Sequence, residues 1–282
     1  MKLSFSKMHG AGNDYIYVDC FAQEISKPEQ AAIIMSDRHF GVGSDGLVLI
    51  MPSKIADLRM RMFNADGSEG KMCGNASRCV GKYAYEHGLI KKNEFSLETL
   101  SGIKHLYLKN DGNTVTSVTV DMGHPILTPS EIPVTGSGER FIDQPVMVND
   151  VCYRITALSM GNPHAVIFCD DVDSLPLADI GPDFEHLPIF PERVNTEFVR
   201  IIDEHTLQMR VWERGSGETL ACGTGACASV VAAALNGYCK QGEEIAVKLL
   251  GGELYITYTS DDKVLMRGSA THVFDGVMEL AL

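Results

Sequence analysis

The 282-residue sequence lacks the features that mark several classes of protein. It has no surplus of basic residues: 24 Lys and Arg stand against 37 Asp and Glu, for a formal net charge of −13. This balance argues against partners such as nucleic acid or an anionic membrane surface. The N-terminus has no apolar stretch of the length that a signal peptide needs, so we expect a cytoplasmic protein. With 45% apolar residues, the chain is expected to fold as one large domain or two ordinary ones.

Metal and nucleotide signatures are also lacking. None of the eight cysteines is spaced Cys-x-x-Cys, so neither a zinc ribbon nor a thioredoxin motif is indicated. A chain of this length needs no disulfides, and a cytoplasm would keep them reduced. Residues 41–46 fit Gly-x-Gly-x-x-Gly, but they lead into the predicted strand 47–51 and not into a helix, so we reject a dinucleotide site.

One long uncharged stretch is present, at residues 219–239. It consists mainly of Ala, Ser, Cys and Val and contains three glycines, which makes it too weakly hydrophobic to span a membrane. A helix that is small and uncharged on every side is typical of a buried core position. We therefore predict a central core helix here.

The chain also repeats itself. Shifted by 149 residues without gaps, Gly12-Asn13 falls on Gly161-Asn162, and Cys73-Gly74 falls on Cys222-Gly223. Further identities cluster around the two Cys-Gly pairs. In each copy a β-like run (58–63 and 206–212) and a glycine-bearing loop precede the Cys-Gly pair, and β-like runs follow at 94–100 and 253–259. The sequence thus predicts two copies of one α/β unit, with residues 123–138 as the passage between them and a short helix in the loops of 170–192.

Each Cys-Gly pair is predicted to open a helix of about 15 residues that ends at Gly88 or Gly237. A helix N-terminus favours a thiolate, and its unpaired N–H groups can hold a carboxylate. Two such thiols related by a pseudo-twofold axis suit proton removal from one face of a carbon and proton return to the other. We interpret Cys73 and Cys222 as such a pair. The other six cysteines are interpreted as packing residues.

Six motifs resemble those of the diaminopimelate epimerase family of cofactor-independent amino-acid racemases. They lie at residues 8–14, 64–67, 72–76, 161–164, 193–195 and 212–225, in the family order. The resemblance implies an α/β fold of two pseudo-symmetric domains, each a mixed sheet around an apolar helix, with the active site in the cleft between them. It implies interconversion of L,L- and meso-diaminopimelate in lysine and peptidoglycan precursor synthesis, without cofactor or metal, by a homodimer. We place the domains at 1–122 with 270–282, carrying Cys73, and at 123–269, carrying Cys222.

The resemblance also assigns roles to individual residues. The acid and base are Cys73 and Cys222, with His164 and Glu213 as polar catalytic partners. The carboxylate cradle is Gly74, Asn75, Gly223 and Thr224. The substrate ligands are Asn13, Asn64, Asn162, Asn195, Glu213 and Arg214, of which Arg214 suits the distal carboxylate. Some members carry glutamine where this chain has Gly46, so a contact from that position is absent here or comes from a neighbour.

Three alternatives stay open from the sequence. The first is a racemase of the same fold for histidine or another amino acid, although Asn64, Asn195 and Arg214 favour a substrate with a second amino-acid end. The second is a cysteine hydrolase with His164 as base, which leaves one cysteine without a role. The third is a non-catalytic carboxylate-binding or redox-sensing protein that uses the two thiols as a reversible disulfide.

Overall fold

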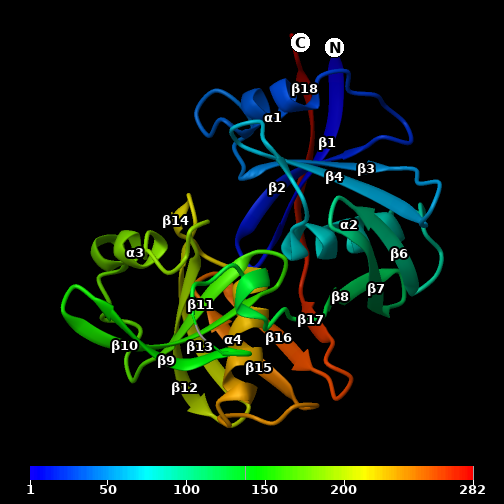
Figure 1. Cartoon of the computed structure of the whole chain (residues 1–282). Helices are drawn as coiled ribbons and strands as arrows, with labels where there is room; N and C mark the ends of the chain where they lie inside the picture. The colour runs from blue at the N-terminus through cyan, green and yellow to red at the C-terminus, as the bar shows by residue number, and fades with distance from the viewer. Residues whose placement is uncertain (137, 282) are drawn as a thin grey trace. The chain divides into compact units, whose positions relative to one another are not determined.

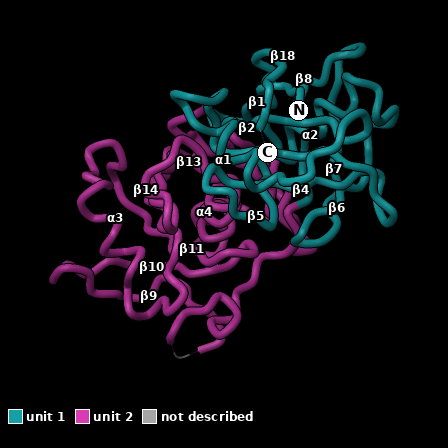
Figure 2. The backbone as a smooth tube through the Cα atoms, turned by 90° about the horizontal axis from the view of Figure 1, so that it is seen from above, with its two compact units in different colours: residues 1–121, 267–282 teal, residues 122–266 magenta. Residues whose placement is uncertain are grey.

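A computed structural model describes residues 1–136 and 138–281 (Figure 1). The chain forms two compact units, Met1–Asp121 with Arg267–Leu282, and Met122–Met266 (Figure 2). Each unit combines a mixed sheet with helices, so the predicted α/β class is confirmed. The predicted domain limits, 1–122 with 270–282 and 123–269, stay a prediction. They include residues 137 and 282, which lie outside the described residues.

The N-terminal segment of the first unit contributes eight strands and two helices to its described residues. They are β1 (Lys2–Gly10), β2 (Asn13–Asp19), α1 (Pro28–Ser36), β3 (Gly46–Met51), β4 (Leu58–Asn64), β5 (Glu69–Gly70), α2 (Gly74–Glu86), β6 (Glu94–Thr99), β7 (Gly102–Asp111) and β8 (Thr114–Gly123). The C-terminal strand β18 (Thr271–Glu279) returns to this unit and pairs antiparallel with β1.

The second unit has a closely similar order of elements. They are η1 (Pro129–Glu131), β9 (Phe141–Val148), β10 (Val151–Ser159), β11 (Pro163–Phe168), α3 (Leu177–Glu185), β12 (Asn195–Asp203), β13 (Thr206–Glu213), β14 (Gly217–Glu218), α4 (Gly223–Leu235), β15 (Glu244–Leu249), β16 (Gly252–Tyr258) and β17 (Val264–Gly268). The strands β8 and β17 run past the limits of their units by two residues each.

Strand pairing follows the same pattern in both units. β1 and β2 pair antiparallel, β2 and β3 parallel, β3 and β4 antiparallel, and β4 and β6 parallel. The strands β10, β11, β12, β13 and β15 repeat this series with the same directions. The internal repeat of the sequence is therefore a repeat of topology.

Each unit has a helix packed against its strands. The helix α2 contacts β1, β2 and β7, and α4 contacts six strands from β10 to β16. The small side chains of α4 are buried on nearly every face, as the uncharged composition of 219–239 predicted. A helix with so little side-chain volume lets strands approach from several directions. No helix in the described part of the chain is long and apolar enough to cross a membrane.

The ends of the two helices agree with the sequence. Both begin directly after the cysteine, and Gly88 and Gly237 follow their C-terminal caps with φ of 75° and 79°. Glycine adopts this left-handed conformation without strain, which terminates a helix. The predicted strands at 47–51, 58–63, 94–100, 206–212 and 253–259 and the short helix within 170–192 are also present.

Candidate active site

In the first unit, Cys73 is the N-cap residue of α2. Its Sγ accepts a hydrogen bond from the backbone N–H of Ala76 (3.5 Å). The thiol also donates to Oδ1 of Asn13, 3.4 Å away. Asn13 lies at the start of β2, next to the turn from β1, so a strand end and a helix start meet at this sulfur.

In the second unit, Cys222 is the N-cap residue of α4. Its Sγ accepts from the backbone N–H of Gly225 (3.4 Å) and lies 3.5 Å from Oγ1 of Thr224. The side chain is buried, with 5% of its surface exposed. Burial, together with the nearby carboxylates of Glu213 and Glu197, raises the pKa of the Cys222 thiol well above its ordinary value.

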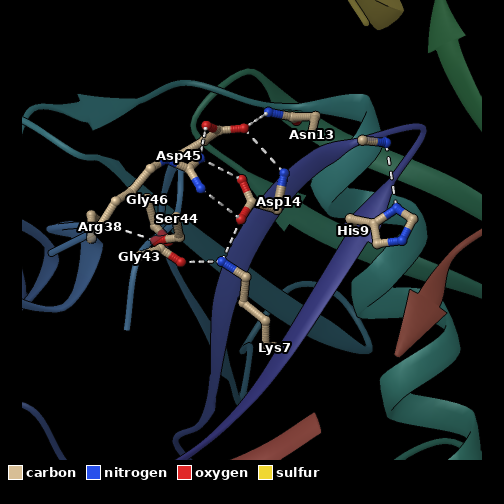
Figure 3. Close-up of polar contacts among 11 residues, drawn as sticks. Lys7, His9, Asn13, Asp14, Arg38, Gly43, Ser44, Asp45 and Gly46 are labelled. Carbon is tan, nitrogen blue, oxygen red and sulfur yellow. Dashed lines mark hydrogen bonds and ion pairs between the residues drawn. The ribbon is translucent and has the colours of Figure 1, made fainter. Parts of the chain in front are cut away.

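Asn13 and Asn75 hold each other in place beside Cys73. Asn75, the second residue of α2, is buried and donates from Nδ2 to Oδ1 of Asn13 (3.3 Å). Nδ2 of Asn13 donates to Oδ2 of Asp45 (2.7 Å), and Figure 3 shows Asp45 between Asn13 and Arg38. The predicted site residues of this unit are thus joined to a carboxylate that the sequence analysis did not select.

Asn64 occupies a more open position at the end of β4. Its side chain is exposed, and Nδ2 donates to Oγ of Ser68 (3.0 Å) in the loop that leads towards α2. The backbone N–H of Asn64 also donates to the carbonyl of Ser68 (2.8 Å), which closes this loop into a tight turn. The turn leaves the Asn64 amide exposed and its second N–H group available.

His164 lies in the centre of the second unit, with no exposed surface. Its Nδ1 is 2.7 Å from Oε1 of Glu197, which is equally buried, and its Nε2 is 3.0 Å from Oδ1 of Asn162. The parallel register of β11 and β12 places His164 opposite Asn195 and so brings Glu197 alongside it. The second carboxylate oxygen of Glu197, Oε2, is buried without a hydrogen-bond partner.

Glu213 ends β13 close to the second thiol. Oγ1 of Thr219 donates to its Oε1 (2.5 Å). Burial raises the pKa of the Glu213 carboxyl, against the lowering effect of hydrogen bonds from Thr219 and Cys222. A carboxyl group of raised pKa that hydrogen-bonds a thiol is suited to exchange a proton with it.

Asn195 and Arg214 are also connected. The backbone N–H of Arg214 donates to Oδ1 of Asn195 (3.0 Å), whose Nδ2 donates to the carbonyl of Pro163 (2.8 Å). The guanidinium of Arg214 donates from Nη1 to the carbonyl of Glu192 (2.8 Å) and keeps four other N–H groups for further acceptors. Asn195 is buried, so it acts on the position of the Arg214 backbone.

Two carboxylates beside the thiols were missed by the sequence analysis. Glu197 lies in the buried first five residues of β12, directly before Phe198 and Val199, and an ionisable residue next to such apolar residues was the available signal. Asp45 lies in the glycine-rich segment 41–46, which was considered only as a dinucleotide motif, so its carboxylate was not selected as a site residue. Gly46, next to it, has no room for a side chain, because a Cβ there would lie 2.0 Å from the carbonyl oxygen of Phe63.

In residues 1–136 and 138–281, no three His, Cys, Asp or Glu side chains gather closely enough to hold a metal ion. The donors that remain suitable for a ligand are of another kind. They are the N-terminal N–H groups of α2 and α4, the Arg214 guanidinium and the asparagine amides. This set is suited to carboxylate and amino groups.

The comparisons with known proteins agree on one family. The family model described as diaminopimelate epimerase matches residues 5–128 and 156–273. Curated relatives named diaminopimelate epimerase include those of Acetivibrio thermocellus, 54% identical over 99% of both chains, and of Methanococcus maripaludis, 53% identical over 99% of this chain and 100% of the relative. The relative from Desulfovibrio desulfuricans is 55% identical over 97% of both.

Solved structures of low sequence identity share the fold. A phenazine biosynthesis protein of the PhzF family from Bacillus anthracis aligns with a TM-score of 0.70 at 17% identity, covering 99% of this chain and 100% of that one. A hydroxyproline epimerase from Agrobacterium vitis aligns with a TM-score of 0.68 at 14% identity, covering 98% and 91%. With full-length relatives above 50% identity and a family model that spans both units, the chain belongs to the diaminopimelate epimerase family.

Proposed function

We propose that this chain interconverts L,L- and meso-diaminopimelate by moving the α-proton between the thiols of Cys73 and Cys222. The observation that carries the proposal is the equivalence of the two cysteines. Each is the N-cap residue of the 13-residue helix of its unit, and each sulfur accepts a hydrogen bond from the N–H three residues later. A packing cysteine has no reason to recur at this position in both copies of a repeat.

The reaction needs one thiolate and one thiol on opposite faces of the α-carbon. The thiolate takes the α-proton, the electron pair of the C–H bond moves towards the carboxylate, and the thiol returns a proton from the other face. The two sulfurs thereby exchange protonation states, and the reverse reaction restores them. Backbone N–H groups at the starts of α2 and α4 stabilise the negative charge that builds on the carboxylate. In this proposal both thiols must reach the same α-carbon.

Glu213 and His164 have supporting roles in this proposal. Glu213 accepts the proton of Cys222 when that thiol is needed as the base, because the carboxyl group hydrogen-bonds the sulfur. His164 holds Oδ1 of Asn162, which leaves the NH₂ group of that amide for the substrate.

The remaining predicted ligands divide into two groups. Gly74, Asn75, Gly223 and Thr224 cradle the carboxylate of the reacting centre. Asn13, Asn64, Asn162 and Arg214 bind the rest of the substrate, and Asn195 acts on it by holding the backbone of Arg214. Arg214 pairs with the distal carboxylate of the substrate through two parallel hydrogen bonds. A substrate with only one amino-acid end leaves the second group without partners, which favours diaminopimelate over histidine.

We further propose that the protein acts in the cytoplasm as a homodimer, with diaminopimelate as its small-molecule partner. The negative net charge supports the absence of a nucleic-acid partner.

The test is incubation with L,L-diaminopimelate in D₂O under reducing conditions, followed at the α-position by NMR. Formation of the meso form with deuterium at the α-carbon is the expected result, and its absence would refute the proposal. Parallel incubations with L-histidine and with acyl esters distinguish the related racemase and the cysteine hydrolase. A redox sensor would show none of these reactions.

A further inference from the structure

Four side chains in the first unit form a hydrogen-bonded chain whose direction is fixed at both ends. Nη2 of Arg78 donates to Oδ1 of Asn75 (2.9 Å), and Nδ2 of Asn75 donates to Oδ1 of Asn13 (3.3 Å). Nδ2 of Asn13 then donates to Oδ2 of Asp45 (2.7 Å). A guanidinium has only donors and a carboxylate only acceptors, so the two amides between them keep all three bonds in one orientation alone.

This orientation of the Asn13 amide determines which of its atoms faces the sulfur of Cys73. Its sulfur lies 3.4 Å from Oδ1 of Asn13, an atom that can only accept. The protonated thiol gains a hydrogen bond there, whereas a thiolate faces the negative end of the amide dipole. A hydrogen bond made only by the neutral form of an acid disfavours its ionisation.

Asp45 is itself held firmly. Its Oδ1 accepts from Nη2 of Arg38 (2.9 Å), and its Oδ2 accepts from the backbone N–H of Asp14 (3.1 Å) as well as from Asn13. Arg38 also pairs with Asp14, whose second cation is the buried Lys7 (Figure 3). Arg38, Asn13 and the backbone N–H of Asp14 all donate to the Asp45 carboxylate, so this carboxylate acts as a fixed acceptor for Asn13.

We propose that Asp45 is a positioning residue for Cys73: by holding the amide of Asn13 it turns Oδ1 towards the sulfur and keeps the proton on this thiol in the free protein. The proposal rests on the proposed function of Cys73 as an acid/base group. It deepens that function by making Cys73 a proton donor before substrate binds.

Other groups around the sulfur act in the opposite sense. The N–H of Ala76 donates to Sγ (3.5 Å), and the start of α2 carries the positive end of the helix dipole. Arg78, buried on the same helix, adds a positive charge. Both features favour the thiolate, so removal of the acceptor on Asn13 should lower the pKa of Cys73.

Two further titratable groups lie near Cys73 on β2 and α2. Burial raises the pKa of the Cys79 thiol to about 11 and that of the Tyr17 hydroxyl well above 10. Both are neutral near pH 7 and contribute no charge there. The charged groups beyond Asn13 are those of the Asp45 cluster, namely Lys7, Asp14, Arg38 and Asp45 itself.

The test measures alkylation of Cys73 by iodoacetamide against pH in the full chain, with peptide mass spectrometry to separate the cysteines. In Asp45→Ala the Nδ2 group of Asn13 loses its acceptor, and only the long bond from Asn75 (3.3 Å) still holds Oδ1 towards the sulfur. We expect the neutral thiol to lose its hydrogen bond as the amide turns, and the midpoint for Cys73 to fall by about half to one pH unit. Exposed Cys152 serves as the internal reference and should not change. Asp57→Ala is the matched control: Asp57 accepts from the N–H of Ser96 (2.8 Å) and pairs with Lys92 (2.7 Å) in the same unit.

Three further variants define the outcome. Asn13→Ala should reproduce the shift of Asp45→Ala, and the double variant should add nothing further, because Asp45 acts through Asn13. Asp45→Asn should stay near the wild-type midpoint, since its amide oxygen can still accept from Asn13, although its NH₂ group cannot replace Oδ1 as the acceptor for Arg38.

An unchanged midpoint in Asp45→Ala, an equal shift in Asp57→Ala, or additive shifts in the double variant would each overturn the proposal. If Asp45→Ala does not fold, an unchanged midpoint in Asn13→Ala overturns it equally. Alkylation needs no turnover, so a chain that shows the shift but no epimerisation refutes the proposed function and leaves the positioning role standing.

Discussion

The substitution Gly225→Ala separates two physical effects of opposite sign. Gly225 is the third residue of α4, and alanine in place of glycine within a helix is ordinarily favourable by up to about 1 kcal/mol. A Cβ at this position, however, would lie 2.6 Å from Oε1 of Glu197. That oxygen already lies 2.7 Å from Nδ1 of His164, and neither side chain has any exposed surface.

The steric effect should prevail. Oε1 must move by about 0.8 Å to reach an ordinary van der Waals contact, and that movement weakens its hydrogen bond with His164. Overpacking of a buried site costs about 1–3 kcal/mol, which exceeds the gain in helix propensity. We expect the free energy of unfolding to fall by about 1–2 kcal/mol, measured by urea denaturation with an unchanged m-value.

Two variants test the reason for this loss. Gly81→Ala makes the same change in α2, where the new Cβ meets only side-chain methyl groups of Leu106, Leu108 and Val118 at 3.2 Å, so it should cost less than Gly225→Ala. Glu197→Asp shortens the carboxylate, so its cost and that of Gly225→Ala should be less than additive in the double variant. A stability of Gly225→Ala equal to or above that of the wild type, or strictly additive costs, would refute the reasoning.

Three other outcomes are expected. Cys73→Ala and Cys222→Ala should each abolish turnover in the deuterium assay while exposed Cys152→Ala retains it; a single-cysteine variant with near-normal turnover would contradict the two-base mechanism. Arg214→Lys should reduce kcat/KM for diaminopimelate by about tenfold or more without a change in unfolding free energy, because a point charge cannot pair with a carboxylate in the bidentate manner; an unchanged kcat/KM would remove Arg214 from the substrate site. Burial raises the pKa of the Cys222 thiol above its value in the unfolded chain, so the neutral thiol adds to the stability of the fold below about pH 9, and this contribution is lost as the pH rises through the folded pKa. Cys222→Ser should therefore lose less stability than the wild type above pH 9, measured by urea denaturation. An equal loss in both proteins would contradict this.

Much of the fold could be predicted because the repeat is visible in the letters. Cys73-Gly74 and Cys222-Gly223 mark the starts of two helices of equal length, and Gly88 and Gly237 mark their ends. Such local signals need no knowledge of tertiary contacts. The carboxylates Asp45 and Glu197 could not be predicted in the same way, because their partners come from other strands and loops at distances of 32 and 33 residues along the chain.

The places where the repeat fails are nevertheless informative. The counterpart of Glu197 in the first unit is Val48, and the counterpart of Gly225 is Ala76; both are fully buried. A valine beside an alanine and a glutamate beside a glycine are two solutions to the same packing problem, since the longer carboxylate needs the space that the missing Cβ leaves. The two changes are physically coupled: in the second copy a buried carboxyl group stands where the first copy has only apolar packing.

The repeat-related asparagines show the same divergence of chemistry on a common backbone. Asn13 has its NH₂ group taken by Asp45 and presents an oxygen to Cys73, whereas Asn162 has its oxygen next to Nε2 of His164. One amide is thus fixed as an acceptor, and the other keeps donors available for a ligand. A duplicated unit supplies two thiols in equivalent positions, but proton transfer from one face of a carbon to the other needs one acid and one base at a time. In the proposed reaction, the amide of Asn13 would hold the proton on Cys73, whereas the amide of Asn162, which lies next to His164, would offer its NH₂ group to the substrate.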